Sequence, residues 1–229
     1  MVALQRKIAR PDLARTTGLL YLGLAVTGLF GFLLIRSQLF VAGDAAATLT
    51  RLVEHEGLAR AGIAFELLIV LTQTLTAVWF HRLFREVDAV AAGSIAAFGL
   101  INAVAILGSA ALLATAAEVA LHPIGDAAAS VQVLYLVSGH LWTAGGLFFG
   151  LWLIPMGWCV LRSGRMPRPL GWVLAGGGVG YVLSPFVAYL VPEAGVLADV
   201  LVVPASVGEF WIIGYLLIRG AGRVTATAP

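Results

Sequence analysis

A short basic turn between two long apolar runs is the feature that most restricts the fold of this chain. Residues 161–172 read Leu-Arg-Ser-Gly-Arg-Met-Pro-Arg-Pro-Leu-Gly-Trp, whereas the flanking residues 147–160 and 173–190 contain no charged side chain. Because arginine is costly to bury in lipid, the turn must stay in water. Short loops rich in Lys and Arg remain in the cytoplasm, so the pattern predicts a cytoplasmic turn that joins two membrane spans.

The composition supports a membrane-embedded chain. Its 229 residues are 60% hydrophobic and only 11% charged, whereas soluble domains carry about 25% charged residues. This deficit excludes an ordinary water-soluble fold. The formal net charge is only +2 and its basic residues are scattered between apolar runs, so no nucleic-acid partner is expected. The preference for Arg over Lys, with many Ala and Gly residues, favours a bacterial source.

Six apolar segments are long enough to cross a bilayer, since each crossing needs about 20 residues. The predicted fold is an all-α, polytopic integral membrane helical bundle that forms a single transmembrane domain over residues 1–229. The predicted spans are residues 16–35, 58–80, 89–116, 131–161, 170–190 and 200–218. The first segment follows basic residues, as in a signal peptide. It is longer than the usual apolar region of a signal peptide and no Ala-x-Ala site ends it, so we predict an uncleaved span.

The basic residues between the spans predict the orientation of the chain. Eleven fall on one side: Arg6, Lys7, Arg10, Arg15, Arg82, Arg85, Arg162, Arg165, Arg168, Arg219 and Arg223. Three fall on the other side: Arg36, Arg51 and Arg60. Since positively charged loops stay inside, we predict that both termini lie in the cytoplasm. With the bacterial composition, this indicates a multi-pass protein of the bacterial cytoplasmic (inner) membrane.

Residues 36–57 form the longest stretch that is expected outside lipid. Asp44 follows a glycine and precedes three alanines, which is typical of a helix N-cap. A short surface helix should follow and end at Gly57. Glu56 precedes Arg60 by four residues, the order that favours an ion pair along a helix.

Several short motifs are spread over nearly the whole chain. They are Arg162-Ser163-Gly164, Pro167-Arg168, Leu170-Gly171, Gly180-Tyr181 and Gly208-Glu209, with Gly43-Asp44 and Arg60 in the first outer region. Together they resemble the signature of the DUF4386 family. The resemblance implies a bacterial multi-pass membrane protein and supplies no activity. Within the turn, we expect Gly164 and Pro167 to set the backbone. Arg162 and Arg168 should hold the orientation and are suited to bind anionic headgroups.

Polar side chains within the spans are the candidates for a functional site, because lipid offers them no hydrogen-bond partner. The set comprises Glu66, Gln73, Asn102, His140 and Glu209, with Arg60 at the mouth of the second span. We predict that they line an outward-facing polar pocket, in which Glu209 faces the bundle interior near His140 or Glu66. Gln73 and Asn102 also fit plain hydrogen bonds between helices.

Three functions remain open from the sequence. The first is binding or transport of a small or lipidic ligand in the polar pocket. The second is a metal-dependent hydrolase that uses His140 with His55 or His122, although their spacing resembles no metal motif, so no metal or cofactor is predicted. The third is a non-catalytic accessory subunit. It would pack against another membrane protein or a second copy through small-residue faces such as Gly146-x-x-x-Gly150 and Gly176-x-x-x-Gly180.

Overall fold

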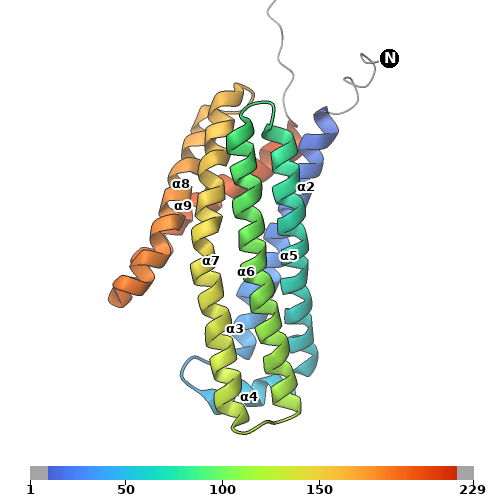
Figure 1. Cartoon of the computed structure of the whole chain (residues 1–229), viewed down its shortest axis with the longest axis vertical. Helices are drawn as coiled ribbons and strands as arrows, with labels where there is room; N and C mark the ends of the chain where they lie inside the picture. Colours follow the sequence, from blue (N-terminus) through green and yellow to red (C-terminus); the bar gives the residue numbers. More distant parts are fainter. Residues whose placement is uncertain (1–9, 221–229) are drawn as a thin grey trace, which may run out of the picture. The chain divides into compact units, whose positions relative to one another are not determined.

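The computed structural model describes residues 10–220, and no strand occurs in this part of the chain (Figure 1). Six of its helical segments are long and apolar enough to cross a membrane: Leu13–Leu39, Glu56–Phe84, Ala89–Leu121, Ala127–Ser163, Arg168–Leu190 and Pro192–Ile218. The predicted all-α polytopic membrane fold is therefore confirmed. Each segment is longer than predicted, because polar end turns continue the helix beyond the apolar run. Arg6, Lys7 and Arg223 lie outside the described residues, and the orientation of the termini stays a prediction.

The helices follow one another with short connections. They are α2 (Arg10–Gly28), the π-helix η1 (Leu29–Ile35), α3 (Arg36–Leu39), α4 (Ala45–Glu54), α5 (Glu56–Phe84), α6 (Ala89–Leu121), α7 (Ala127–Ser163), α8 (Arg168–Leu190), the 3-10 helix η2 (Pro192–Ala194) and α9 (Gly195–Ile218). The first span thus consists of most of α2 together with η1 and α3.

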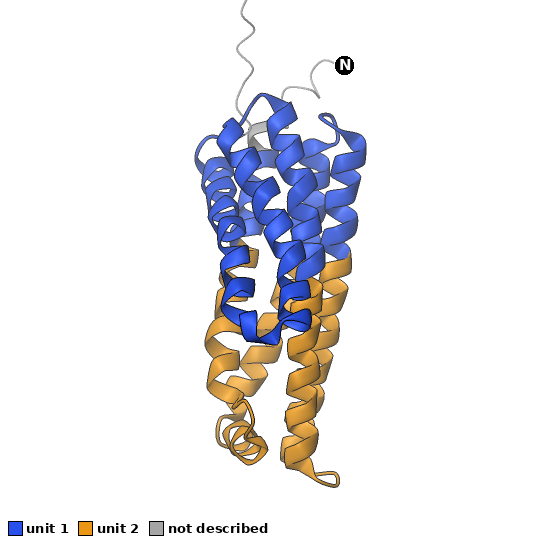
Figure 2. Cartoon of the chain, turned by 90° about the vertical axis from the view of Figure 1, so that its left-hand side faces the viewer, with its two compact units in different colours: residues 1–22, 74–100, 146–229 blue, residues 23–73, 101–145 orange. Residues whose placement is uncertain are grey.

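Two compact units divide the chain (Figure 2). Unit 1 comprises residues 1–22, 74–100 and 146–229, and unit 2 comprises residues 23–73 and 101–145. Helices α2, α5, α6 and α7 each contribute residues to both units.

Glycines bring the backbones of α7 and α8 into contact within unit 1. A Cβ atom on Gly157 would lie 2.5 Å from the carbonyl oxygen of Gly171, and one on Gly150 would lie 2.6 Å from that of Gly178. Gly150 and Gly157 are seven residues apart on α7, and so are Gly171 and Gly178 on α8. Seven residues make about two helical turns, so each two glycines lie on the same face of their helix. These four glycines form what we call the glycine seam.

The seam corrects the predicted small-residue faces. Gly150 belongs to it, but Gly176 has no atom within 4 Å of an added Cβ. Gly177 and Gly180 instead face α9, where added Cβ atoms would collide with Ala205 and with the carbonyl oxygen of Leu201. Small residues therefore serve helix packing inside the unit, as such residues commonly do in membranes.

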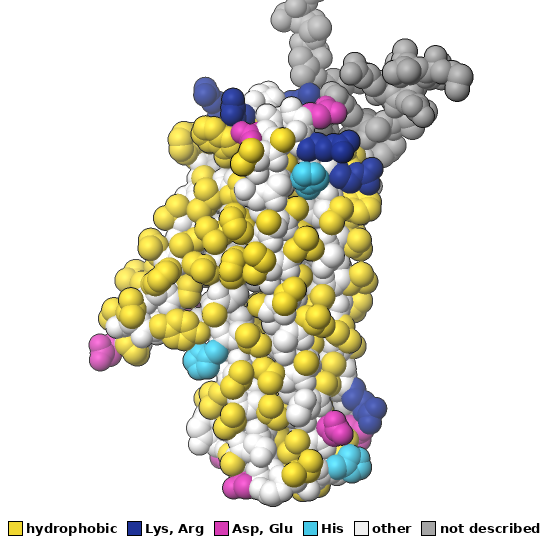
Figure 3. Space-filling view, viewed as in Figure 1, with side chains coloured by type: hydrophobic (Ala, Val, Ile, Leu, Met, Phe, Trp, Pro, Cys, Tyr) yellow, Lys and Arg dark blue, Asp and Glu magenta, His cyan; other side chains and the backbone are white. Residues whose placement is uncertain are grey.

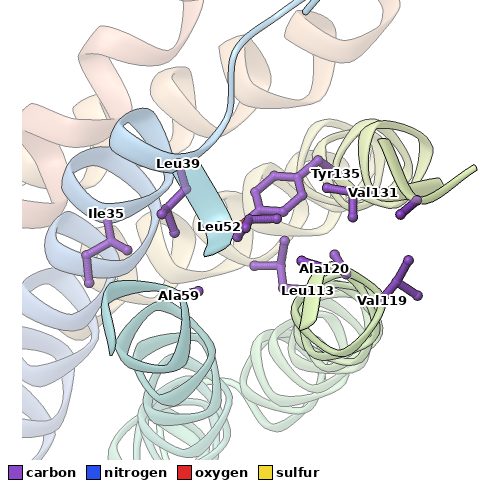
Figure 4. Packing of buried hydrophobic residues seen from close by; sticks show 11 residues of the cluster. Ile35, Leu39, Leu52, Ala59, Leu113, Val119, Ala120, Val131 and Tyr135 are labelled. Atoms are coloured by element: carbon purple, nitrogen blue, oxygen red, sulfur yellow. The ribbon is translucent and has the colours of Figure 1, made fainter. Parts of the chain in front are cut away.

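Helix α4 packs against the spans of unit 2 through apolar contacts. The Asp44 carboxylate accepts a hydrogen bond from the Ala47 backbone N–H at 2.8 Å, which confirms the predicted N-cap. Leu52 of α4 is buried in a cluster with Leu39, Leu113 and Tyr135, which belong to α3, α6 and α7 (Figure 4). The helix ends at Glu54, before Gly57, because α5 already begins at Glu56. Helix α4 is thus fastened to the spans through its apolar face.

Large apolar side chains remain exposed along the spans (Figure 3). Val104, Phe186 and Phe210 retain 67%, 52% and 64% of their accessible surface. Soluble monomers rarely expose contiguous apolar surface of this kind, whereas lipid tails cover it without cost. The exposed surface therefore agrees with the membrane assignment.

Candidate functional site

A buried polar cluster in unit 2 links four spans. Its side chains are Arg36 of α3, Glu66 of α5, Ser109 of α6, and Ser138 and Trp142 of α7. We call this set the Arg36–Glu66 cluster. Charged side chains inside membrane spans are rare and mark functional sites by default, so the cluster is the main candidate site.

Arg36 is the most heavily contacted member of the cluster. Its guanidinium donates to the Ser138 hydroxyl at 2.8 Å and to the Tyr135 carbonyl oxygen at 2.7 Å. It also lies over the rings of Phe32 and Tyr135, at 5.7 and 5.6 Å from their centroids. Aromatic faces and a carbonyl oxygen stabilise a cation away from water, which explains how an arginine with an 11% exposed side chain is accommodated.

Glu66 is only partly satisfied by its neighbours. Its side chain is 2% exposed, and its Oε1 atom lies 3.8 Å from Arg36 Nη1, near the limit for an ion pair. The Trp142 indole N–H donates to the same Oε1 atom at 3.1 Å. The Oε2 atom is buried without a hydrogen-bond partner. Such an unpaired buried oxygen costs about 1–3 kcal/mol, so a ligand or a proton that reaches it is stabilised.

Two serines complete the cluster. The Trp142 indole N–H also donates to the Ser109 hydroxyl at 3.1 Å, and the Ser109 and Ser138 hydroxyls are 2.7 Å apart. The chain of contacts therefore runs from Glu66 through Trp142 and the serines back to Arg36. A change in the charge of Glu66 would be felt by Arg36 both directly and through these hydroxyls.

The π-helix η1 sets the direction of Arg36. The backbone N–H of Arg36 bonds to the Gly31 carbonyl oxygen, five residues earlier, as in a π-helix. One extra residue in a helical turn rotates the following side chains by about 100° relative to an unbroken α-helix. π-Segments of this kind are frequent at functional sites. In unit 2, η1 turns Arg36 toward Ser138 and Glu66.

The predicted position of Arg36 outside lipid was wrong. The sequence predicted that residue 36 begins the stretch outside lipid, but the first candidate span continues through Arg36 to Leu39. The sequence contained one signal for this, because apolar residues resume at Leu39 after only three residues. The π-turn that aims the side chain inward was not readable from spacing.

Of the six predicted pocket residues, Glu66 belongs to the cluster. Gln73 and Asn102 are also buried in unit 2, and an added Cβ on Gly145 would lie 3.1 Å from Asn102 Oδ1. His140 of α7 is exposed. Arg60 is exposed and pairs with Glu56, with 2.8 Å between Nε and Oε1, as its spacing predicted.

Glu209 has a partner that sequence reasoning missed. In unit 1 its carboxylate accepts a hydrogen bond from the Tyr21 hydroxyl of α2. The Tyr21 ring is 2% exposed and packs edge-on against Phe80 and Trp152 at 5.3 and 5.5 Å. This partner is 188 positions away along the chain. The predicted approach of Glu209 to His140 or Glu66 stays a prediction.

The basic turn in unit 1 forms an ion pair with Asp88. Gly164 has φ of +61°, a backbone conformation that favours glycine, and Pro167 immediately precedes α8. Arg162 lies 3.2 Å from the Asp88 carboxylate, which also accepts a bond from the Trp158 indole at 3.1 Å. Arg168 is the first residue of α8, and Gly171 lies in the glycine seam.

Asp88 is the residue through which we expect the stability of the turn to depend on pH. The backbone N–H of Ala91 donates to its carboxylate, and this bond, with that from Trp158, holds the pKa of Asp88 below its usual range. Because this pKa is lower in the folded state, the ionised Asp88 stabilises the protein at pH values above the unfolded-state pKa of about 3.9. This stabilisation is lost as the pH falls through the folded-state pKa.

We expect Asp88→Ala to lower the melting temperature near neutral pH and to make the melting temperature less dependent on acid pH. Thermal unfolding in detergent checks this, with the exposed Glu193→Ala as control; equal melting curves would contradict it.

The described histidines do not form a metal centre. Among residues 10–220, no group of three or more His, Cys, Asp and Glu side chains is placed to hold a metal ion. The structure therefore gives the hydrolase prediction for His55, His122 and His140 no geometric support.

Comparison with known proteins gives one match. Residues 16–220 match the family described as "Domain of unknown function (DUF4386)". No curated protein and no solved structure matches the chain.

Proposed function

We propose a function on the premise that the chain belongs to the DUF4386 family, whose function is unknown and whose match covers most of the sequence. The proposed function is binding and transport of a small anionic solute together with a proton, at the Arg36–Glu66 cluster. One observation carries the proposal. An arginine and a glutamate meet loosely inside the spans, and one carboxylate oxygen is left without a partner.

The chemistry follows from the inventory of donors. A guanidinium has five N–H donors, so Arg36 can bind a carboxylate or phosphate while it keeps its bonds to Ser138 and Tyr135. An incoming anion would compete with Glu66 for Arg36. If Glu66 then takes up one proton, the cluster again holds one cation and one anion. The charge inside the membrane is unchanged, which avoids the cost of a net buried charge.

The other two candidate functions receive less support. A hydrolase lacks a metal-holding group among the described residues. An accessory subunit would need free small-residue faces, but the seam glycines and Gly180 already contact helices of their own unit. In this proposal the protein lies in the bacterial inner membrane, and both termini are on the cytoplasmic side, as the basic residues predict.

Proteoliposomes that contain an entrapped pH dye test the proposal. Succinate, inorganic phosphate and gluconate, which do not cross lipid readily, are added outside while the membrane potential is clamped. We expect at least one of them to acidify the lumen of vesicles that carry the wild-type protein. Glu66→Gln and Arg36→Gln should each lower the initial rate at least about tenfold, since each removes one half of the exchange.

Glu56→Gln is the matched control, because it removes an exposed carboxylate that pairs with Arg60 at the surface. It should acidify at the wild-type rate. Acidification no faster than in empty vesicles for all three solutes would overturn the proposal. So would a Glu66→Gln protein that matches the wild type.

A further inference from the structure

We propose that a surface groove in unit 1 binds the phosphate headgroup of an anionic phospholipid. The groove lies between residues 164–167 of the basic turn and the C-terminal half of α9, and its volume is about 710 Å³. This falls within the range of small-molecule sites, about 300–1,000 Å³. The site does not involve the Arg36–Glu66 cluster and stands independently of the proposed transport function.

Charge is the first argument for this ligand. Two arginines line the groove, Arg165 from the turn and Arg219 from the end of α9, and none of its lining residues is acidic. The nearby Arg162 does not line the groove and is paired with Asp88. Arginine recognises phosphate oxygens through its planar fork of N–H donors. The groove therefore presents two cations to an anionic group.

The apolar lining is the second argument. Phe210 and Ile218 line the groove with 64% and 78% of their surface exposed, and Trp211 and Tyr215 lie between them along α9. Tryptophan and tyrosine concentrate at the level of lipid headgroups. Arg165 and Arg219 themselves stand just beyond the ends of the candidate spans at Ser163 and Ile218. A phospholipid offers both parts, a phosphate for the arginines and acyl carbons for the rings.

The groove is preformed. The Tyr215 hydroxyl donates to the Arg165 carbonyl oxygen at 2.7 Å, which fixes the turn against α9. Gly164 permits the tight turn with its φ of +61°. Gly214 lines the groove, and an added Cβ there would have no neighbour within 4 Å. The space beside Gly214 is therefore open to a ligand.

Native mass spectrometry of the detergent-purified, delipidated protein tests this inference. Phosphatidylglycerol and phosphatidylcholine with identical acyl chains are the probes. We expect preferential retention of phosphatidylglycerol by the wild type. The Arg165→Gln/Arg219→Gln double variant should lose at least about tenfold in its apparent affinity, since each basic residue contributes to binding of anionic lipid. Gly214→Phe should lower retention while both arginines stay in place.

Arg82→Gln/Arg85→Gln is the matched control, because it removes two exposed basic residues of the same unit outside the groove. It should retain phosphatidylglycerol as the wild type does. Equal retention of both lipids by the wild type would overturn the inference. Equal loss in both double variants, unchanged retention in the groove variants, or displacement of the lipid by millimolar inorganic phosphate would do so as well.

Discussion

Replacing Arg36 with methionine is expected to destabilise the protein by about 3–5 kcal/mol, the usual cost of leaving one charge of a buried pair without its partner. Glu66 would lose its cationic neighbour, and the Ser138 hydroxyl and the Tyr135 carbonyl oxygen would each lose the hydrogen bond that Arg36 donates. Glu66 can take up a proton and become neutral, and this limits how much stability the variant loses. Unfolding by titration with a denaturing detergent measures it.

The double variant Arg36→Met/Glu66→Met separates the charge from the packing. Removing both charges should recover much of the lost stability, because well-packed apolar pairs often replace buried ion pairs without cost. Arg60→Met is the control, since this exposed arginine pairs with Glu56 at the surface, and such pairs contribute about 0–1 kcal/mol. A single Arg36→Met variant as stable as the wild type would show that the pair is not closed from water.

Replacing Gly157 with alanine is expected to cost about 1–3 kcal/mol or more, the range found for overpacked sites. The added methyl group would lie 2.5 Å from the Gly171 carbonyl oxygen and 2.7 Å from the Ala175 nitrogen. Both are backbone atoms of α8, so a side-chain rotation cannot relieve the contact, and α7 and α8 must separate. The same unfolding titration measures the loss.

Gly176→Ala is the matched control on α8, because its added methyl group meets nothing within 4 Å. It should be neutral or stabilising by up to about 1 kcal/mol, since alanine favours a helix over glycine. If Gly157→Ala and Gly176→Ala unfold alike, the close approach of α7 and α8 at this glycine is wrong.

The sequence predicted the secondary structure well because apolar length alone identifies membrane spans. The capping role of Asp44 and the pairing of Glu56 with Arg60 were also predictable, since both depend on residues three or four positions apart. The turn at Gly164 belongs to the same class of local features.

The candidate site could be predicted only in part. Glu66 stood out as a charge in an apolar run, but its partner Arg36 was assigned to water, because a π-turn and the packing of several spans decide where that side chain points. The bond between Tyr21 and Glu209 joins opposite ends of the sequence, so no local spacing could show it. The glycine motifs predicted that glycines would lie at close helix contacts. They did not predict which helix faces meet, because that depends on how whole helices pack.

Infrared difference spectroscopy of the reconstituted protein tests the central claim most directly, because a protonated carboxyl group has its own absorption band. The probe is whichever of succinate, inorganic phosphate or gluconate drives proton uptake. Its addition should produce the band of a protonated carboxyl in the wild type and in Glu56→Gln, and the band should be absent in Glu66→Gln. A band of equal size in Glu66→Gln, or no protonated carboxyl in the wild type when the solute is bound, would contradict the account.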